Sequence, residues 1–316
     1  MFDADVTRDK PIAIAILAMG GQGGGVLTGW IVAVAEANFC AMYGYDIKLL
    51  DGAPAWSEPK SATPLAQVID SAAYYADGRP TSRHTFYGAV MNESRGRAMV
   101  LGGAQWGNGW MLSTMDGFSV TANDWDKAAS FASAPSEFTA ASGSAVVADR
   151  ASGDIYTFAS YAVSRWSSAS NSWTKVLSSV ATYGQYAASA MDTKRNRILV
   201  QGGLINDHGL YDVASNSMSN VTFTGPNAGD MTGDTGNGMV YDPGLDVYLL
   251  RKAGAGGTIY RINAQTFYVD TLPTTSGSAV PSAINNVWNR FLYVPQLKGV
   301  IFFPAFDGNA WFVRTS

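Results

Sequence analysis

Histidine is the side chain that most often serves as an acid–base group or a metal ligand, and this sequence contains only two. His84 lies in TSRHTFYG next to Arg83, and His208 lies in INDHGLYD next to Asp207. The two histidines, with Arg83 and Arg290, are the groups from which a polysaccharide lyase could be built. Both histidines also stand where a strand end or a hairpin is expected, which is an ordinary structural position. We therefore predict no catalytic residue.

The acidic and sulfur-containing residues add no further catalytic or metal-binding pattern. A glycosidase needs two carboxylates at a fixed separation, and no such pair stands out. Many aspartates are instead expected to cap their own turns, namely Asp149, Asp154, Asp192, Asp242 and Asp246. The single cysteine, Cys40, excludes an internal disulfide bond and a cysteine-rich zinc site. We predict no metal and no cofactor.

The tryptophan residues indicate a ligand-binding site rather than a catalytic site. AQWGNGWM (104–111) places Trp106 and Trp110 on a glycine-rich hairpin loop. Trp288 and Arg290 lie at the start of the last repeated unit. Exposed indole faces suit sugar rings or protein partners, although the same residues can pack between neighbouring sheets. The candidate ligand-binding residues are Arg83, His84, Trp106, Trp110, Asp207, His208, Trp288 and Arg290.

Composition limits the class of protein. Only 15% of the 316 residues are charged and 34 are glycine, which favours a β-rich chain with many turns. The net charge is −4 and no basic run is present, so we predict no nucleic-acid partner. No apolar stretch is long enough for a membrane span. An acidic start speaks against a signal peptide at residues 11–37. The compartment stays open, with an exterior setting (secreted, cell-surface or virion-associated) favoured, and the oligomeric state is not predicted.

Two recurring patterns predict the fold. In the first, an aromatic residue is followed seven positions later by an aromatic residue or Met across a polar turn, which predicts a hairpin. In the second, small or apolar residues lead through a polar turn into an apolar strand. The copies are 118–125, 166–173, 211–218 and 260–267 for the first pattern, and 89–103, 145–159, 189–203, 238–252 and 291–305 for the second. Two hairpins in every ~50 residues make a four-stranded unit, the repeat of a β-propeller.

Strands that end in a double glycine, VLGG (100–103) and VQGG (200–203), each followed by a strand and an aromatic residue after a polar turn, resemble the kelch repeat. The last unit (289–316) is similar to the closing blade of kelch-like and galactose-oxidase-like propellers. The resemblance covers about residues 40–316. It implies an all-β, kelch-like β-propeller of four-stranded blades, five or six in number. Galactose-oxidase-like enzymes hold copper with a tyrosine cross-linked to cysteine, but nothing places Cys40 beside such a tyrosine.

The last unit ends after its third strand, and a closed propeller leaves no open sheet edge. We therefore expect YDIKLLDGAPAWSE (45–58) to complete this blade, so that an N-terminal strand closes the ring. A sixth, irregular blade is a further option for residues 11–80. The predicted division is an atypical segment over 1–38 and a propeller over 39–316.

The N-terminal stretch KPIAIAILAMGGQGGGVLTGWIVAVAEAN (10–38) resembles the start of the gamma-type domain of 2-oxoacid ferredoxin oxidoreductases, such as the indolepyruvate enzyme. The resemblance implies a strand, a glycine turn that can hold an anionic group, and a helix. Three interpretations stay open: a fused or vestigial segment, a glycine turn within an irregular blade, or a working cofactor loop.

Three functions follow from these patterns. The first is a non-catalytic binding or structural propeller that holds a glycan or a protein partner at its mouth and loops. The second is a carbohydrate-active enzyme, a polysaccharide lyase or an oxidase, at the same mouth. The third is a subunit related to 2-oxoacid oxidoreductases. A repeat scaffold with aromatic loops and few catalytic groups favours the first.

Overall fold

The computed structural model describes the chain in fourteen stretches, and every structural statement below concerns them. They are residues 13–16, 42–46, 55–69, 71–105, 108–140, 143–159, 161–178, 185–203, 208–232, 235–254, 256–273, 280–283, 286–304 and 310–315. Most of the segment 1–38 lies outside them, so its likeness to an oxidoreductase domain stays a prediction. Cys40, Trp106 and Asp207 lie outside them too.

Strands are the main regular elements of the described residues. In chain order these are β1 (Ala13–Ile16), β2 (Met42–Asp46), β3 (Ala55–Lys60), β4 (Arg83–His84), β5 (Ala89–Asn92), β6 (Arg97–Leu101), β7 (Ala104–Gln105), β8 (Met115–Ser119), β9 (Asp124–Trp125), β10 (Ala145–Ala148), β11 (Ile155–Ala159), β12 (Ala162–Ser167), β13 (Ser172–Ser178), β14 (Ala188–Asp192), β15 (Arg197–Gln201), β16 (Gly209–Asp212), β17 (Ser217–Asn220), β18 (Gly238–Asp242), β19 (Val247–Arg251), β20 (Tyr260–Asn263), β21 (Val269–Thr271), β22 (Phe291–Val294), β23 (Gly299–Phe302) and β24 (Trp311–Arg314). The helical elements are short: α2 (Ser136–Ala140) and the 3-10 turns η1 (Leu65–Gln67), η2 (Glu93–Arg95), η3 (Ala228–Met231), η4 (Trp288–Arg290) and η5 (Pro295–Leu297). No helix among the described residues is both long and apolar enough to span a membrane.

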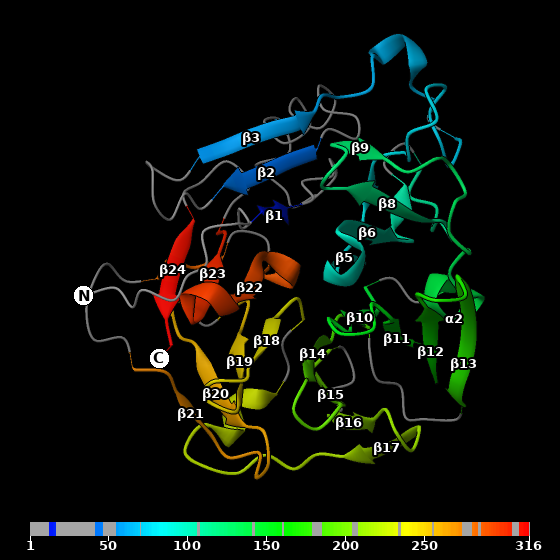
Figure 1. Cartoon of the computed structure of the whole chain (residues 1–316). Coiled ribbons are helices and arrows are strands. Elements are labelled where there is room, and N and C mark those ends of the chain that lie inside the picture. Colours follow the sequence, from blue (N-terminus) through cyan, green and yellow to red (C-terminus); the bar gives the residue numbers. More distant parts are fainter. Residues whose placement is uncertain are drawn as a thin grey trace.

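Five antiparallel sheets surround a common axis and form a five-bladed β-propeller (Figure 1). The first four blades are β5-β6-β8-β9, β10-β11-β12-β13, β14-β15-β16-β17 and β18-β19-β20-β21, and the fifth is β22-β23-β24 among the described strands. The prediction of an all-β propeller with four-stranded blades is confirmed. The strands β5, β10, β14, β18 and β22 are innermost, and each of the first four packs against the next.

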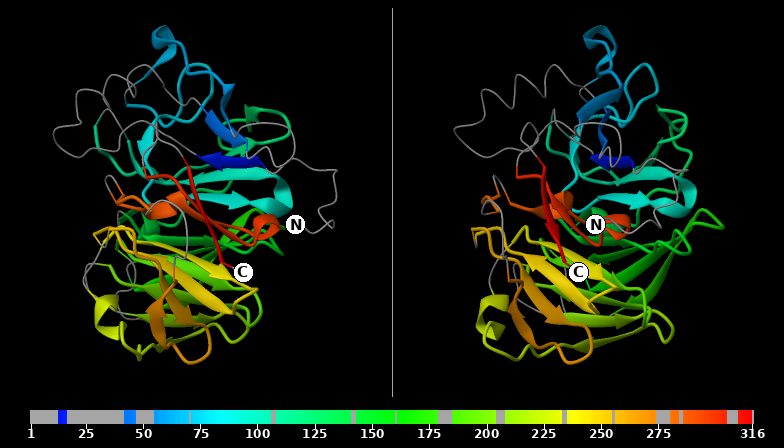
Figure 2. Two further views of the ribbon diagram at one scale, coloured as in Figure 1. Left: turned by 90° about the vertical axis from the view of Figure 1, so that its left-hand side faces the viewer. Right: turned by 60° about the vertical axis from the view of Figure 1, so that its left-hand side comes forward.

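The two faces of the ring differ in the loops that they carry (Figure 2). On the turn face, the second sequence pattern makes the short turns that join the first two strands of each blade. On the opposite face, here called the mouth face, the innermost strands begin and the second strands end. The backbone ladders show this directly, since Gly238 at the start of β18 pairs with Arg251 at the end of β19.

The prediction that residues 45–58 complete the last blade does not match the described pairing. Strand β2 instead pairs with β1 and β3 in a separate three-stranded sheet. Figure 1 places this sheet in the sector between the fifth and first blades, with β1 nearest the axis. An ion pair of 2.7 Å between Lys60 and Asp124 ties β3 to the outer strand of the first blade.

All four copies of the first sequence pattern form hairpins, and in three of them the two large residues face each other. Phe118 faces Trp125, Trp166 faces Trp173 and Tyr211 faces Met218 across antiparallel pairs. Facing large side chains stabilise such pairs by about 0.2–1 kcal/mol each. The fourth copy differs, because Tyr260 faces Thr271 and Phe267 lies in the hairpin with a φ of 55°. That hairpin is longer, so its aromatic residue reaches the turn rather than the strand.

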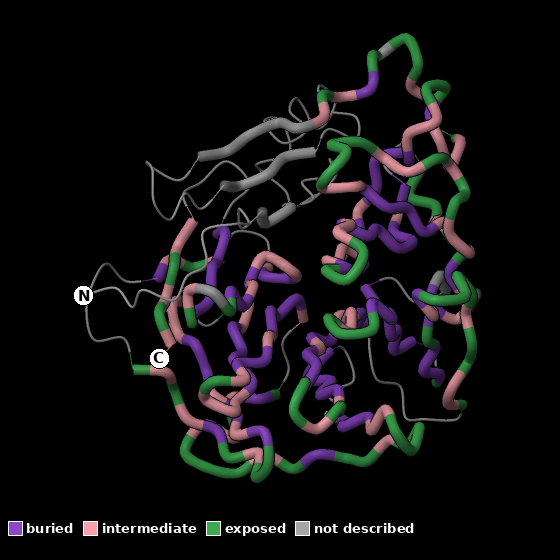
Figure 3. Tube along the Cα trace, viewed as in Figure 1, coloured by how far each residue is buried: buried purple, intermediate pink, exposed green. Residues whose placement is uncertain are grey.

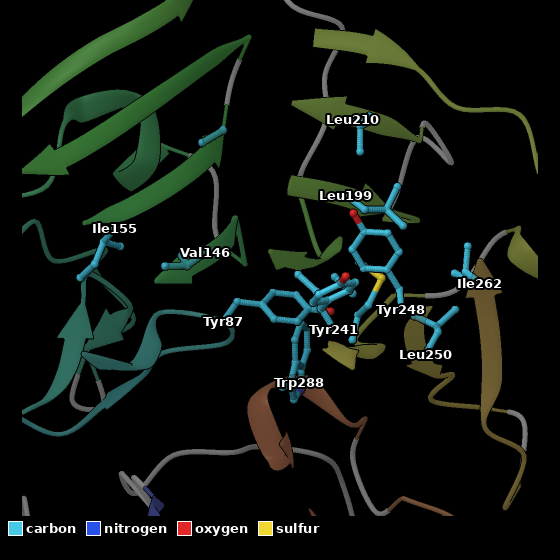
Figure 4. Close-up of a cluster of buried hydrophobic side chains, with 14 of the residues drawn as sticks. Tyr87, Val146, Ile155, Leu199, Leu210, Tyr241, Tyr248, Leu250, Ile262 and Trp288 are labelled. Carbon is cyan, nitrogen blue, oxygen red and sulfur yellow. The ribbon is translucent and has the colours of Figure 1, made fainter. Parts of the chain in front are cut away.

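Buried residues lie mainly on the strands of the blades (Figure 3), and their apolar side chains form the core. The largest cluster takes residues from the first four blades and Trp288 from η4, and Figure 4 shows Tyr87, Tyr241 and Trp288 meeting near the axis. Burial of this surface, worth roughly 25 cal/mol per Å², holds the blades around the axis.

Polar turns join the blades on the turn face. Asn92 donates to the carbonyl of Gly153 in the next blade at 2.9 Å, and Arg195 bridges Asp192 and Asp246 across the third and fourth blades. The turns therefore carry structural contacts between blades.

Candidate functional site

A chain of backbone hydrogen bonds links the second, third, fourth and fifth blades on the mouth face, just before their innermost strands. Tyr186 donates to the carbonyl of Gly143 at 2.8 Å, Gly236 to that of Tyr186 at 3.3 Å, and Trp288 to that of Gly236 at 3.0 Å. Asn289 then donates from its side chain to the carbonyls of Tyr87 and Ala89 in the first blade. The loops at the mouth are thus fixed to one another directly.

Three aromatic side chains carried by these loops pack together. Phe86 and Tyr186 have ring centroids 5.5 Å apart, Phe86 and Trp288 are also 5.5 Å apart, and Tyr186 and Trp288 are 5.7 Å apart. The rings meet at steep angles, a favourable arrangement for aromatic pairs. Trp288 is buried, whereas Phe86 and Tyr186 are half-buried. We call Phe86, Tyr186, Trp288 and the adjoining His84 the mouth cluster.

The three aromatic residues share an unusual backbone conformation. Their φ angles are 52° at Phe86, 62° at Tyr186 and 48° at Trp288. A bulky residue in this region is strained by about 1–3 kcal/mol, and such strain gathers at functional sites. Gly143 and Gly236 take the same turn before their strands, with φ of 72° and 77°. Where these two blades use glycine, the other three place a large ring.

His84 extends the mouth cluster. Its ring stacks on Phe86 with centroids 3.8 Å apart. Burial lowers the pKa of His84 from its usual 6.5 to about 4, because the charged imidazolium is poorly solvated there. At neutral pH the ring is therefore uncharged and offers one hydrogen-bond donor and one acceptor.

Arg83, the neighbour of His84, is wholly buried and holds this segment in place. Its guanidinium forms an ion pair of 2.7 Å with Asp116 and donates to the hydroxyl of Thr114 at 2.7 Å. Arg83 therefore holds the strand of His84 in position through buried contacts. The sequence analysis had named Arg83 as a candidate ligand-binding residue.

His208 also lies on the mouth face, but in another environment. Its Nδ1 accepts a hydrogen bond of 3.2 Å from the backbone N–H of Gly202, and its ring lies 4.8 Å from that of Phe223. The ring contacts of His84 and His208 have no residue in common. These described contacts do not assemble the two histidines into one acid–base pair.

The hairpin after β7 presents an indole to solvent. Trp110 is 75% exposed, and its carbonyl accepts from the N–H of Gln105 at 2.8 Å. Strand β7 pairs with β4, so this hairpin is attached to the strand that carries His84. Trp106 and Asp207, the other predicted partners, fall outside the described residues.

Arg290 lies in η4 with Trp288. It donates to the carbonyls of Pro304 at 2.7 Å and of Val287 at 3.4 Å. Burial, and then the charge of Arg251, lower its pKa to about 10. The group remains a cation at neutral pH.

Aspartates of the turns act mainly in structure. The carboxylates of Asp149, Asp192 and Asp242 accept from backbone N–H groups of their own turns, as predicted. Asp154 and Asp246 pair instead with Arg165 and Arg195. Within the described residues, no three His, Cys, Asp or Glu side chains gather as a metal site.

Sequence reasoning named Trp288 and His84 as candidates and did not name Phe86 and Tyr186. A signal was present: Tyr186 lies two residues before a β-strand, at the place taken by Gly143 and Gly236 in neighbouring blades. Aligning these positions across the repeats would have shown an aromatic residue where glycine would adopt the positive φ with less strain.

No family model and no curated protein matches this sequence.

Proposed function

We propose that this chain is a non-catalytic binding propeller that holds a glycan at the mouth cluster. The observation that carries the proposal is the packing of Phe86, Tyr186 and Trp288 in strained backbone conformations around the axis. Strain of this kind persists where surrounding structure fixes it, and the backbone hydrogen bonds of the mouth supply that support.

The chemistry of the mouth cluster favours a sugar ligand. Ligand sites are mostly apolar and aromatic, with a few fixed polar groups that orient the ligand. Phe86 and Tyr186 supply partly exposed aromatic surface, and the uncharged His84 supplies a donor and an acceptor. Trp110, on the hairpin attached to the His84 strand, adds an exposed indole. Aromatic faces flanked by neutral hydrogen-bonding groups suit the apolar faces and hydroxyls of sugar rings.

The described contacts favour binding over catalysis. His84 and His208 contact different aromatic residues, and Arg83 is committed to Asp116. A lyase or oxidase would need such groups within hydrogen-bond reach of one reacting atom.

We also propose that the propeller is of the kelch-like type and that its ring is completed from the N-terminal side. The double glycines at 102–103 and 202–203 support the first point, since all four have positive φ. A Cβ atom on Gly103 would lie 2.7 Å from the carbonyl oxygen of His84. The sheet β1-β2-β3, placed between the fifth and first blades, supports the second (Figure 1). An exterior location would suit a glycan-binding chain.

A screen of immobilised glycans tests the function. The wild-type chain is expected to retain a defined subset of neutral and acidic oligosaccharides and to release each of them chemically unchanged. Tyr268→Ala is the matched control, because Tyr268 is 47% exposed and lies in the hairpin after β20, on the turn face. The proposal fails if no glycan is retained, or if retention disappears in Tyr268→Ala and persists in Tyr186→Ala. Retention of a protein alone would indicate the protein-binding alternative.

A further inference from the structure

Arg251 ends strand β19 on the mouth face and is completely buried. Among the described residues, two of its N–H-bearing nitrogens, Nε and Nη1, have no hydrogen-bond partner. Its third nitrogen, Nη2, donates to the carbonyls of Gly256 at 2.8 Å and of Pro281. A buried polar group without a partner is rare in folded proteins and calls for a water molecule, an ion or a ligand.

Among the described residues, the guanidinium of Arg251 contacts an aromatic ring and backbone carbonyls but no carboxylate. Its guanidinium carbon lies 4.1 Å from the centre of the Phe302 ring, in the fifth blade. The described residues give it no carboxylate partner. Burial lowers its pKa to about 10, so the side chain is still charged at neutral pH. The protein therefore keeps a positive charge with unused donors between the fourth and fifth blades.

A second guanidinium stands close by. Gly238, which pairs with Arg251, packs against the segment of Arg290, since a Cβ atom on Gly238 would lie 3.0 Å from the carbonyl oxygen of Trp288. Consistent with this, the charge of Arg251 contributes, after burial, to the lowered pKa of Arg290. Arg290 donates to the carbonyl of Pro304, which follows the strand that carries Phe302. The like charges of Arg251, in the fourth blade, and Arg290, before the fifth, repel each other. A bound anion would replace this repulsion with attraction to both cations.

Open space adjoins the carbonyl of Gly256 that Arg251 contacts. A Cβ atom on Gly254 or Gly256 would meet nothing within 4 Å, whereas one on Gly257 would lie 2.3 Å from the carbonyl oxygen of Val280.

We propose that Arg251 and Arg290 form a site for an anionic group, a carboxylate or a sulfate, between the fourth and fifth blades. Guanidinium groups bind planar or multi-oxygen anions through charge-assisted hydrogen bonds, and the unused nitrogens of Arg251 supply the donors. The anion is either a free ion or the acidic substituent of a larger ligand such as a uronic acid oligosaccharide. The site stands on different residues from the mouth cluster.

Thermal unfolding of the full chain tests the site. Low-millimolar sodium sulfate is compared with sodium chloride of equal ionic strength, and a uronic acid trisaccharide with its neutral counterpart. Stabilisation by sulfate is expected to saturate, because binding to the folded state alone raises Tm. In Arg251→Gln and Arg290→Gln the apparent affinity is expected to fall about tenfold or more, since a charged donor is lost.

Arg261→Gln is the matched control, because Arg261 lies in the same blade and is already paired with Asp270 at 2.6 Å. It removes the same charge and should leave the sulfate effect intact. Arg251→Lys, which keeps the charge, gives a readout if Arg251→Gln does not fold. A response to sulfate indicates a free-anion site, and a response to the uronic acid alone indicates a ligand-borne anion. The proposal is overturned if neither anion distinguishes the Arg251 and Arg290 variants from Arg261→Gln. Loss of neutral-glycan binding in Phe86→Ala, with the sulfate effect retained, would concern the mouth cluster only.

Discussion

The side chain of Asn289 donates a hydrogen bond of 2.8 Å to the backbone carbonyl of Tyr87, 202 residues earlier in the chain. The same amide group also reaches the carbonyl of Ala89 at 2.6 Å. These bonds join η4, which leads into the last blade, to the start of the first blade. They extend to the first blade the series of backbone contacts that links the second, third, fourth and fifth blades on the mouth face.

Asn289→Ala is predicted to weaken the ring at this junction. It leaves two partly buried carbonyls without a donor, which costs about 1–3 kcal/mol of unfolding free energy. Urea unfolding followed by tryptophan fluorescence measures the change. Asn108→Ala is the control, because Asn108 is exposed and bonds only to the N–H of Trp110 nearby among its described contacts. Equal losses in the two variants would show that Asn289 has no special role in closure.

The Asp246 carboxylate is predicted to make the fold sensitive to acid. Hydrogen bonds from Arg195, then Tyr241, hold its pKa well below the usual 3.8. The folded state thus binds the proton more weakly than the unfolded chain. The resulting stability is present above the unfolded pKa and is lost as the pH falls toward the lowered one. Asp246→Asn should be less stable at pH 7 and lose less between pH 5 and pH 2, as measured by urea unfolding.

Asp270→Asn serves as the comparison for that series. Its carboxylate pairs with Arg261 within one blade, whereas Asp246 joins two blades through Arg195. If the unfolding free energy of both variants depended on pH as it does in the wild type, Asp246 would not be the source of the acid sensitivity.

His84 is predicted to titrate near pH 4. Because its folded pKa lies below the unfolded value of 6.5, the stability it contributes is complete above pH 6.5 and falls as the pH drops through about 4. The loss amounts to about 3 kcal/mol from the size of the shift. NMR titration of the two imidazoles, assigned with His208→Gln, measures it. A midpoint near 6.5 for His84 would contradict the buried stack on Phe86.

Gly203→Ala is predicted to destabilise the third blade. Gly203 has a φ of 94°, and a Cβ atom there would lie 2.6 Å from the carbonyl oxygen of Gln185. The strained conformation alone costs about 1–3 kcal/mol. Gly229→Ala, in η3 with open space around it, should change stability by about 0.5 kcal/mol or less, or increase it. Thermal unfolding compares the two, and a similar Tm for both would remove the physical basis of the double glycine.

The sequence was sufficient for the repeat, because each blade repeats local chemistry. Asp192 and Asp242 cap turns that lie between an inner strand and its neighbour, and Trp166 faces Trp173 across a hairpin. Such features depend on residues fewer than about ten positions apart, which a periodic pattern records. This is why the boundaries of the repeated hairpins agree with the structure.

Contacts between distant blades were not predictable in the same way. Residues 45–58 have the character of a missing strand, yet Tyr45 pairs with Ile14 and Trp56. Alternation specifies a strand but not its partner. For Trp288 the sequence left both a ligand surface and packing between blades open. It is 5% exposed and packs against Phe86 and Tyr186, which come from other blades. The mouth cluster exists only once the ring has formed.

The most direct test of the account is the affinity of the retained glycan for the wild-type chain and for Tyr186→Ala, measured by isothermal titration calorimetry. Tyr186 is half-buried and faces both Phe86 and Trp288, so its loss removes aromatic surface from the mouth cluster. The account predicts about a tenfold or greater increase in Kd, with Tyr268→Ala unchanged. An unchanged Kd in Tyr186→Ala and Phe86→Ala, in variants that remain folded, would contradict binding at the mouth cluster.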